Sequence, residues 1–114
     1  SSYFMNAYNN RGMQPHQAVS ALSALAHEAR LAVFRLLVQA GPEGMSAGAI
    51  AEHLALAPSG LTFHLKEPTA AGLLMRHPDG RQVRYSAAYA AMNELMAYLA
   101  ANCCRGEACA LGST

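Results

Sequence analysis

Hydrophobic residues recur at three- and four-residue spacing along most of the chain, which is the pattern of amphipathic helices. Val19, Leu22 and Leu25 share one face of a first helix, which we expect from Pro15 onward. Further helices are expected over residues 29–40, residues 47–54 and residues 58–72. The pattern therefore predicts a mainly α-helical first two thirds of the chain, in which two short helices follow each other closely.

Capping residues and prolines predict where these helices begin and end. A Gly-Pro pair at residues 41–42 ends the second helix, Ser46 can cap the third, and Pro58 fits the first position of the fourth. Inside the fourth helix, Pro68 removes a backbone hydrogen bond and disfavours helix at the residue before it. We therefore expect a kink or an early end near Glu67.

The hydrophobic period changes after this helix. Two short runs, residues 73–77 and 82–85, flank Pro78-Asp79-Gly80, and an Asp-Gly pair between such runs is a strong hairpin signal. Ser86 can then cap a last helix over residues 87–103. The predicted order is helix, helix, helix-turn-helix, hairpin and helix. The fold class is therefore mainly α with a small β-hairpin, a winged helix-turn-helix.

Composition narrows the possible classes of protein. The chain has 114 residues, one domain by size, and is 53% hydrophobic but only 13% charged. This balance excludes a highly charged disordered segment and predicts surface that is buried against a partner. The net charge of +1 gives no indication of nucleic-acid binding by itself. The most apolar stretch, residues 86–101, is too short to span a bilayer.

Domain organisation and cellular location are predicted as follows. Residues 1–12 have no hydrophobic period and are expected to be an added or disordered segment, residues 13–109 the domain, and residues 110–114 a tail. Nothing resembles a secretion signal, and the three cysteines are too few and too closely grouped for a disulfide framework. A reducing cytoplasm is therefore the expected location.

The fourth helix and the hairpin carry the candidate DNA-binding residues. If Leu61 and Leu65 face the core, the opposite side of the helix is free to enter a major groove. Four of the eight basic residues lie between positions 66 and 84, which suits contacts to phosphate. The expected contacts are Ser59, Gly60, Thr62, Phe63, His64, Lys66, Arg76, Arg81 and Arg84. The alternative is a helical hairpin or winged module that binds no DNA.

The cysteines form the second candidate site. Cys103, Cys104 and Cys109 lie within seven positions, and Gly106 lets the chain fold back if the backbone leaves helical geometry. Three thiolates without a neighbouring histidine or aspartate favour a soft, three-coordinate ion such as trivalent arsenic or antimony, whereas structural zinc normally takes a fourth ligand. A tail with incidental thiols and a vicinal disulfide or redox sensor are the alternatives. No base is placed to activate a thiol, so we expect no enzyme activity.

Two stretches resemble the ArsR/SmtB family of bacterial metalloregulatory repressors. Residues 25–37 are similar to the opening helices of that family. Residues 50–74 are similar to its helix-turn-helix and the start of its wing, most clearly at His64-Leu65-Lys66 and Ala71-Gly72-Leu73. The similarity covers residues 18–109. The chain departs from the family pattern where Ala57 replaces the usual serine and Pro68 the usual leucine.

The resemblance implies a homodimer on a palindromic operator that an inducer releases. In the family the first and last helices build the dimer interface, which here implies Leu22, Leu25, Met92, Leu95, Met96 and Leu99. One arsenic-sensing branch carries a Cys-Cys pair and a third cysteine beyond the last helix, as this chain does. The resemblance therefore implies a repressor of arsenic-resistance genes that trivalent arsenic, or antimony, releases from double-stranded DNA. Selectivity for methylarsenite through Cys103 and Cys104 alone is an alternative.

Overall fold

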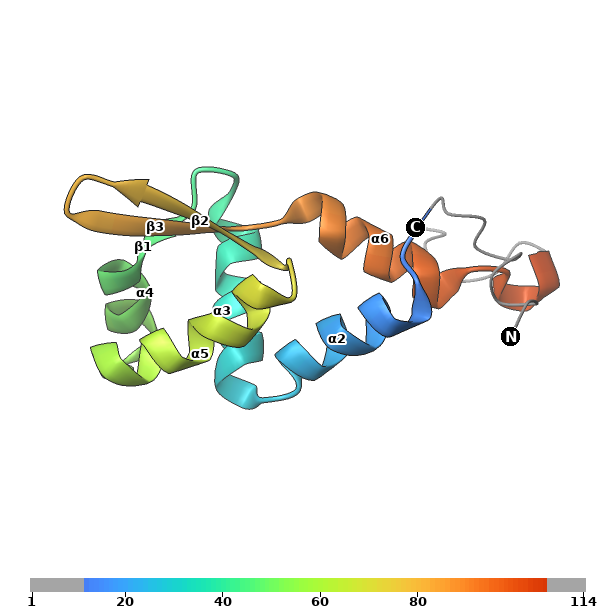
Figure 1. Cartoon of the computed structure of the whole chain (residues 1–114), viewed down its shortest axis with the longest axis horizontal. Helices are drawn as coiled ribbons and strands as arrows, with labels where there is room; N and C mark the ends of the chain where they lie inside the picture. The colour runs from blue at the N-terminus through green and yellow to red at the C-terminus, as the bar shows by residue number, and fades with distance from the viewer. Residues whose placement is uncertain (1–11, 107–114) are drawn as a thin grey trace.

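The structure is a computed structural model that describes residues 12–106, and it shows a winged helix-turn-helix (Figure 1). Its elements are α2 (Pro15–Leu25), α3 (Glu28–Ala40), β1 (Met45–Ser46), α4 (Ala47–Leu54), α5 (Pro58–Ala70), β2 (Leu74–Asp79), β3 (Gln82–Ala87), α6 (Tyr89–Ala100) and a short 3₁₀ segment η1 (Cys103–Gly106). The predicted fold class and element order are confirmed. In Figure 1 the helix-turn-helix and the hairpin form a head, from which α2 and α6 extend side by side.

The core lies around α3, which contacts α2, α4, α5 and β3. Its fully buried residues Val33 and Leu37 pack in a cluster that includes Ile50 of α4 and Leu61 of α5. Tyr89 at the start of α6 donates a 2.8 Å hydrogen bond from its hydroxyl to the carbonyl oxygen of Val38. Because the last carbonyls of a helix lack partners within it, this bond ties α6 to the end of α3.

The helix-turn-helix forms as its capping residues predict. The Ser46 hydroxyl accepts a 3.1 Å hydrogen bond from the backbone N–H of Ala49, and Pro58 occupies the first turn of α5. Between the helices Ala55 adopts a left-handed conformation with φ of 57°, and the N–H of Leu56 bonds the carbonyl of Ala51. This Schellman-type end turns the chain within three residues and fixes α5 across α4.

Of the kink or early end expected near Glu67, the early end is wrong, because α5 continues through Pro68 to Ala70. The Pro68 ring is fully buried in the domain, and burial of its apolar surface offsets the lost hydrogen bond to His64. The carbonyl of Pro68 also accepts a 2.9 Å hydrogen bond from the N–H of Leu73. The proline therefore anchors the end of the helix to the start of the wing.

The wing is a three-stranded antiparallel sheet in the order β1-β3-β2. The two-residue strand β1 was not expected from the sequence. The turn also lies later than expected: Asp79 pairs with Gln82, so Gly80, at φ of 63°, and Arg81 form the loop, while Pro78 lies within β2. Proline is tolerated there because β2 is an edge strand.

Ser86 does not cap the last helix, as its position after the hairpin had suggested. It is buried in β3, with its hydroxyl 2.9 Å from Nε2 of His77, and α6 begins three residues later at Tyr89. Strand pairing between Ser86 and Met75 takes the place of the cap, because the ladder continues to Ala87. The helix also ends earlier than expected, at Ala100.

Candidate nucleic-acid interface

The outward face of α5 is the centre of the candidate interface. Leu61 and Leu65 are buried as expected, which turns Ser59, Thr62 and Lys66 outward. Phe63 is 60% exposed, an unusual exposure for a large aromatic side chain. The Thr62 hydroxyl donates a 3.1 Å hydrogen bond to the carbonyl of Pro58, so its oxygen presents an acceptor to a ligand. Gly60 is half-buried on the same helix.

A groove between α5 and the wing brings basic residues from both elements together. It is lined by Thr62, Lys66 and Thr69 of α5 and by Arg76 of β2 and Tyr85 of β3. Both Lys66 and Arg76 are exposed, and neither makes a salt bridge within the described residues. Two cations facing one groove beside an exposed helix face suit the phosphate backbone of a duplex.

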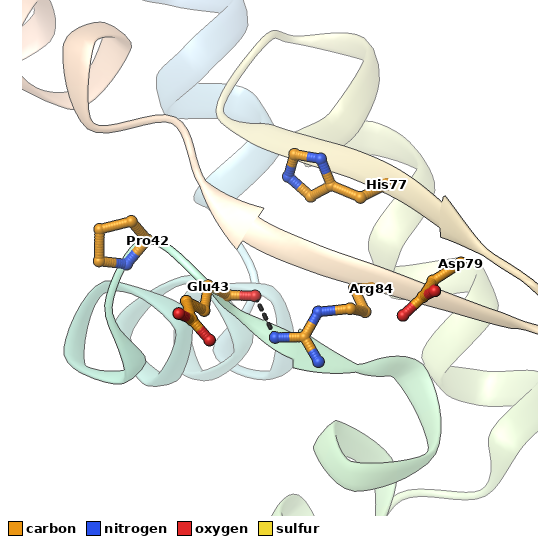
Figure 2. A pocket seen from close by; sticks show the side chains of 5 residues that line it. All are labelled: Pro42, Glu43, His77, Asp79 and Arg84. Atoms are coloured by element: carbon orange, nitrogen blue, oxygen red, sulfur yellow. Dashed lines mark hydrogen bonds between the residues drawn. The ribbon is translucent and has the colours of Figure 1, made fainter.

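Arg84 is placed differently from the expectation that it joins this basic surface. Strand pairing sets Arg76 opposite Tyr85 and His77 opposite Arg84, so the two arginines lie on opposite faces of the wing. Figure 2 shows the Arg84 guanidinium reaching the loop after α3, where it donates to the carbonyl oxygens of Glu43 and Gly44. Arg84 therefore fixes the loop after α3. Besides Arg76, the hairpin has one further exposed arginine, Arg81, at its tip.

His64 is half-buried on the flank of α5 that faces α3. Its ring centroid lies 4.8 Å from that of His27, and Phe63 meets it edge-on at 5.6 Å. Burial lowers the pKa of His64, and the nearby His27 and Arg30 lower it further. The sequence predicted His64 as a DNA-proximal residue but gave no signal that His27 and Arg30 lie beside it.

The expected dimer residues divide between surface and core. Leu22, Met96 and Leu99 are exposed, the last two at 59%, and Val19 on α2 adds to them. Leu25 and Met92 are half-buried, whereas Leu95 packs inside the domain's own core. The long arm of α2 and α6 therefore carries an apolar surface that its own chain leaves uncovered.

The cysteine site lies at the limit of the described residues. Cys103 is half-buried and Cys104 exposed, while Cys109 lies outside the described range. The backbone leaves helical geometry here, as convergence of adjacent thiols requires: Cys104 and Arg105 have φ of 54° and 57°. Within residues 12–106 no three His, Cys, Asp or Glu side chains come together as a metal site. No helix in that range is long and apolar enough to cross a bilayer.

Comparison with known families agrees with this geometry. Residues 25–77 match the model of a helix-turn-helix domain family. The chain carries a winged helix-turn-helix domain. The match spans the end of α2 through the middle of β2, and so includes β1 and both helices of the helix-turn-helix, α4 and α5. No curated protein sequence matches the chain significantly.

Solved structures show where the same winged helix-turn-helix occurs. An ArsR-like transcriptional regulator from Rhodococcus sp. RHA1 is 28% identical, with a TM-score of 0.65 over 74% of this chain and 76% of that one. HlyU from Vibrio cholerae N16961 is 25% identical, with a TM-score of 0.62 over 81% and 99%. A homodimeric winged helix-turn-helix DNA-binding domain, Mb0332 from Mycobacterium bovis, shares the fold at 21% identity, with a TM-score of 0.62 over 81% and 85%. Two of these three neighbours are thus described as an ArsR-like and a possible ArsR-family transcriptional regulator.

Proposed function

We propose that the protein is a homodimeric transcriptional repressor that binds double-stranded operator DNA and leaves it when trivalent arsenic, or antimony, binds its C-terminal thiols. The groove in which Lys66 and Arg76 face each other beside the exposed side of α5 carries the DNA-binding part. The ArsR-like regulator and the other neighbours support the same assignment. The proposal includes no enzyme activity, because the structural neighbours that support it are described as transcriptional regulators.

The dimer is supported by the uncovered apolar surface on α2 and α6 and by the homodimeric neighbour. A second copy of this surface is a suitable cover, since it is apolar and lies on an arm that extends from the head (Figure 1). Pairing two copies presents two α5 helices and two basic grooves, one for each half of a palindromic operator.

Introducing charge into this surface tests the dimer. Met96→Glu with Leu99→Glu is expected to convert the dimer to monomer and to weaken DNA binding by at least about a hundredfold, because each half-site is then bound alone. Sedimentation velocity measures the mass, and fluorescence anisotropy with a duplex selected from a random library measures affinity. Asn93→Glu, an exposed change on the same helix, is the control. A dimeric double variant with unchanged affinity would contradict this interface.

The arsenic site is supported by the adjacent thiols of Cys103 and Cys104 at a segment where the backbone has already left the helix. A left-handed conformation at two consecutive non-glycine residues is strained, and such strain is often found at functional sites. Binding of a soft ion that rearranges this segment acts on the end of the dimer arm. A coupling of about 1–3 kcal/mol changes DNA affinity by roughly 5–150-fold.

Arsenite titration of the protein–DNA complex tests the inducer. Sodium arsenite is expected to release the selected duplex from the wild type, and Cys104→Ser is expected to respond at least about tenfold less, because one of the sulfur ligands is lost. Ser20→Cys, which keeps the arsenic-reactive thiols and adds one elsewhere, is the control. Equal release from Cys104→Ser and wild type would refute the site while leaving DNA binding intact.

Cys109→Ser distinguishes the two arsenic hypotheses. Loss of the arsenite response alone supports three sulfur ligands, whereas an unchanged response to both arsenite and methylarsenite assigns the site to Cys103 and Cys104. The same titration with hydrogen peroxide tests the redox alternative. Release by peroxide and not by arsenite would replace the inducer hypothesis with a thiol-redox regulator.

A further inference from the structure

A cluster of basic and aromatic side chains lies where the corner between α2 and α3 meets α5. The His27 and His64 rings are 4.8 Å apart and tilted by 44°. The guanidinium carbon of Arg30 lies 5.8 Å from the centre of the Phe63 ring. The Phe63 ring also packs edge-on against the His64 ring. His64 and Arg30 thus both approach the exposed Phe63 ring on α5, and His27 packs on the His64 ring.

Two nitrogen atoms of this cluster are buried without a hydrogen-bond partner within the described residues, Nε of Arg30 and Nδ1 of His64. Leaving a buried polar atom unpaired costs roughly 1–3 kcal/mol, so native structures rarely retain one without a ligand or water. His27 differs, because its Nδ1 accepts a 3.1 Å hydrogen bond from the N–H of Ala29. That bond leaves the proton on Nε2, which can donate to an anion.

The charges around His64 oppose its protonation in the free protein. Burial lowers its pKa most, followed by His27 from the corner and Arg30 from α3. The other charged or titratable groups on α5 and on the elements packed against it are Lys66 and Glu67 of α5, Glu28 and Arg35 of α3, His16 of α2, Glu52 and His53 of α4, and Arg76, His77 and Asp79 of β2. Within the described residues no carboxylate makes a salt bridge to Arg30, His27 or His64, so an anion bound there favours protonated His64.

We infer that His27, Arg30 and His64 form a contact site for a backbone phosphate of the duplex, and that DNA binding through this site takes up a proton on His64. The inference rests on the proposed DNA-binding function. His64 lies two residues before Lys66 in α5, so the site is on the opposite flank of the helix from Lys66. The exposed Phe63 ring places it at the edge of the outward face. The two flanks of a helix in the major groove face the two phosphate strands. Lys66 then serves one strand, and the cluster at His64 serves the other.

Proton uptake is measured by the pH dependence of binding. For the wild type, affinity for the selected duplex at constant salt is expected to be at least about tenfold higher near pH 6 than near pH 8. His64→Gln is expected to reduce this ratio by at least about threefold, because glutamine keeps a polar side chain of similar size and cannot take up the proton. The matched control is His53→Gln, because His53 is exposed on α4. This variant is expected to keep the wild-type ratio of affinities at pH 6 and pH 8.

NMR titration of the unmodified protein measures the same event without a substitution. The pKa of the His64 imidazole is expected to rise when the duplex binds. Inorganic phosphate alone at about 10 mM is expected to produce a much smaller rise, because no other contacts to a duplex hold the free ion at the site. Arg30→Gln is expected to make the dependence of log affinity on log salt shallower by about 2 in the dimer, one contact for each protomer.

Equal pH ratios for wild type and His64→Gln, or an imidazole pKa that the duplex leaves unchanged, would overturn the inference. A pKa rise with inorganic phosphate equal to that with the duplex would overturn its assignment to the DNA backbone. In each case salt-dependent binding of the duplex by the wild type shows that the proposed function stands, whereas absence of duplex binding at every pH overturns the function itself.

Discussion

Replacing both Lys66 and Arg76 with glutamine is expected to weaken duplex binding by about a hundredfold near 0.1 M salt, with similar losses on any DNA sequence. The two side chains face one groove between α5 and β2, and a dimer presents that groove twice. Four phosphate contacts are therefore lost, and the slope of log affinity against log salt is expected to become shallower by about 3–4. Fluorescence anisotropy at several salt concentrations measures both quantities.

Arg84→Gln is the control, because it removes one arginine charge from the same hairpin that carries Arg76. The Arg84 guanidinium donates to the carbonyl oxygen of Glu43 (Figure 2) and to that of Gly44, on the opposite face of the wing from Arg76. DNA affinity is expected to change by less than about threefold, since a distant charge is screened by salt. The free energy of unfolding is expected to fall by about 1–2 kcal/mol, because two carbonyls lose a charged donor. If Arg84→Gln weakens DNA binding as strongly as the double variant, the groove is not the interface.

The contrast between Arg76 and Arg84 shows what the sequence could not predict. A hairpin was evident from the Asp-Gly pair, but its register depends on which two residues form the loop. The structure places the loop at Gly80-Arg81 and Pro78 inside an edge strand. Because alternate residues of a strand face opposite sides, the register decides which arginine reaches the DNA side. Count and spacing of arginines alone could therefore predict a basic hairpin but not its basic face.

Local signals predicted the helix-turn-helix well because its determinants are local. The Ser46 cap, Pro58 at the start of α5, and the burial of Leu61 and Leu65 each follow from residues within one or two turns. The continuation of α5 through Pro68 does not, because the ring is accommodated by burial in the core. Tertiary packing decided that helix end, and propensity alone predicted it wrongly.

The cluster at His27, Arg30 and His64 was hidden for the same reason. The two histidines are 37 positions apart, and only the packing of α3 against α5 brings their rings together. The five histidines have no metal-ligand spacing in the sequence, so nothing there distinguishes His27 from the others. The cysteine site is the opposite case, since its three thiols are obvious in the sequence and Cys109 lies outside the described residues.

Gly44→Ala is expected to be the most destabilising single substitution in the wing. Gly44 has φ of 72°, and a Cβ added there would lie 2.0 Å from the carbonyl oxygen of Tyr85 in β3. Since that oxygen belongs to the backbone of the central strand, relief requires the loop or the strand to move. The left-handed conformation alone costs about 1–2 kcal/mol for a residue with a Cβ. With the clash added, the free energy of unfolding is expected to fall by at least about 3 kcal/mol.

Two other glycines separate the steric contribution from the backbone contribution. Gly80 has φ of 63°, and a Cβ added there would lie in open space. Gly80→Ala is therefore expected to lower the free energy of unfolding by only about 1 kcal/mol. Gly48→Ala, in α4 with open space and no positive φ, is expected to gain about 0.5–1 kcal/mol from helix propensity. Urea unfolding of the three variants and wild type measures these differences. If Gly44→Ala loses no more stability than Gly80→Ala, the loop does not approach β3 as closely as the structure shows.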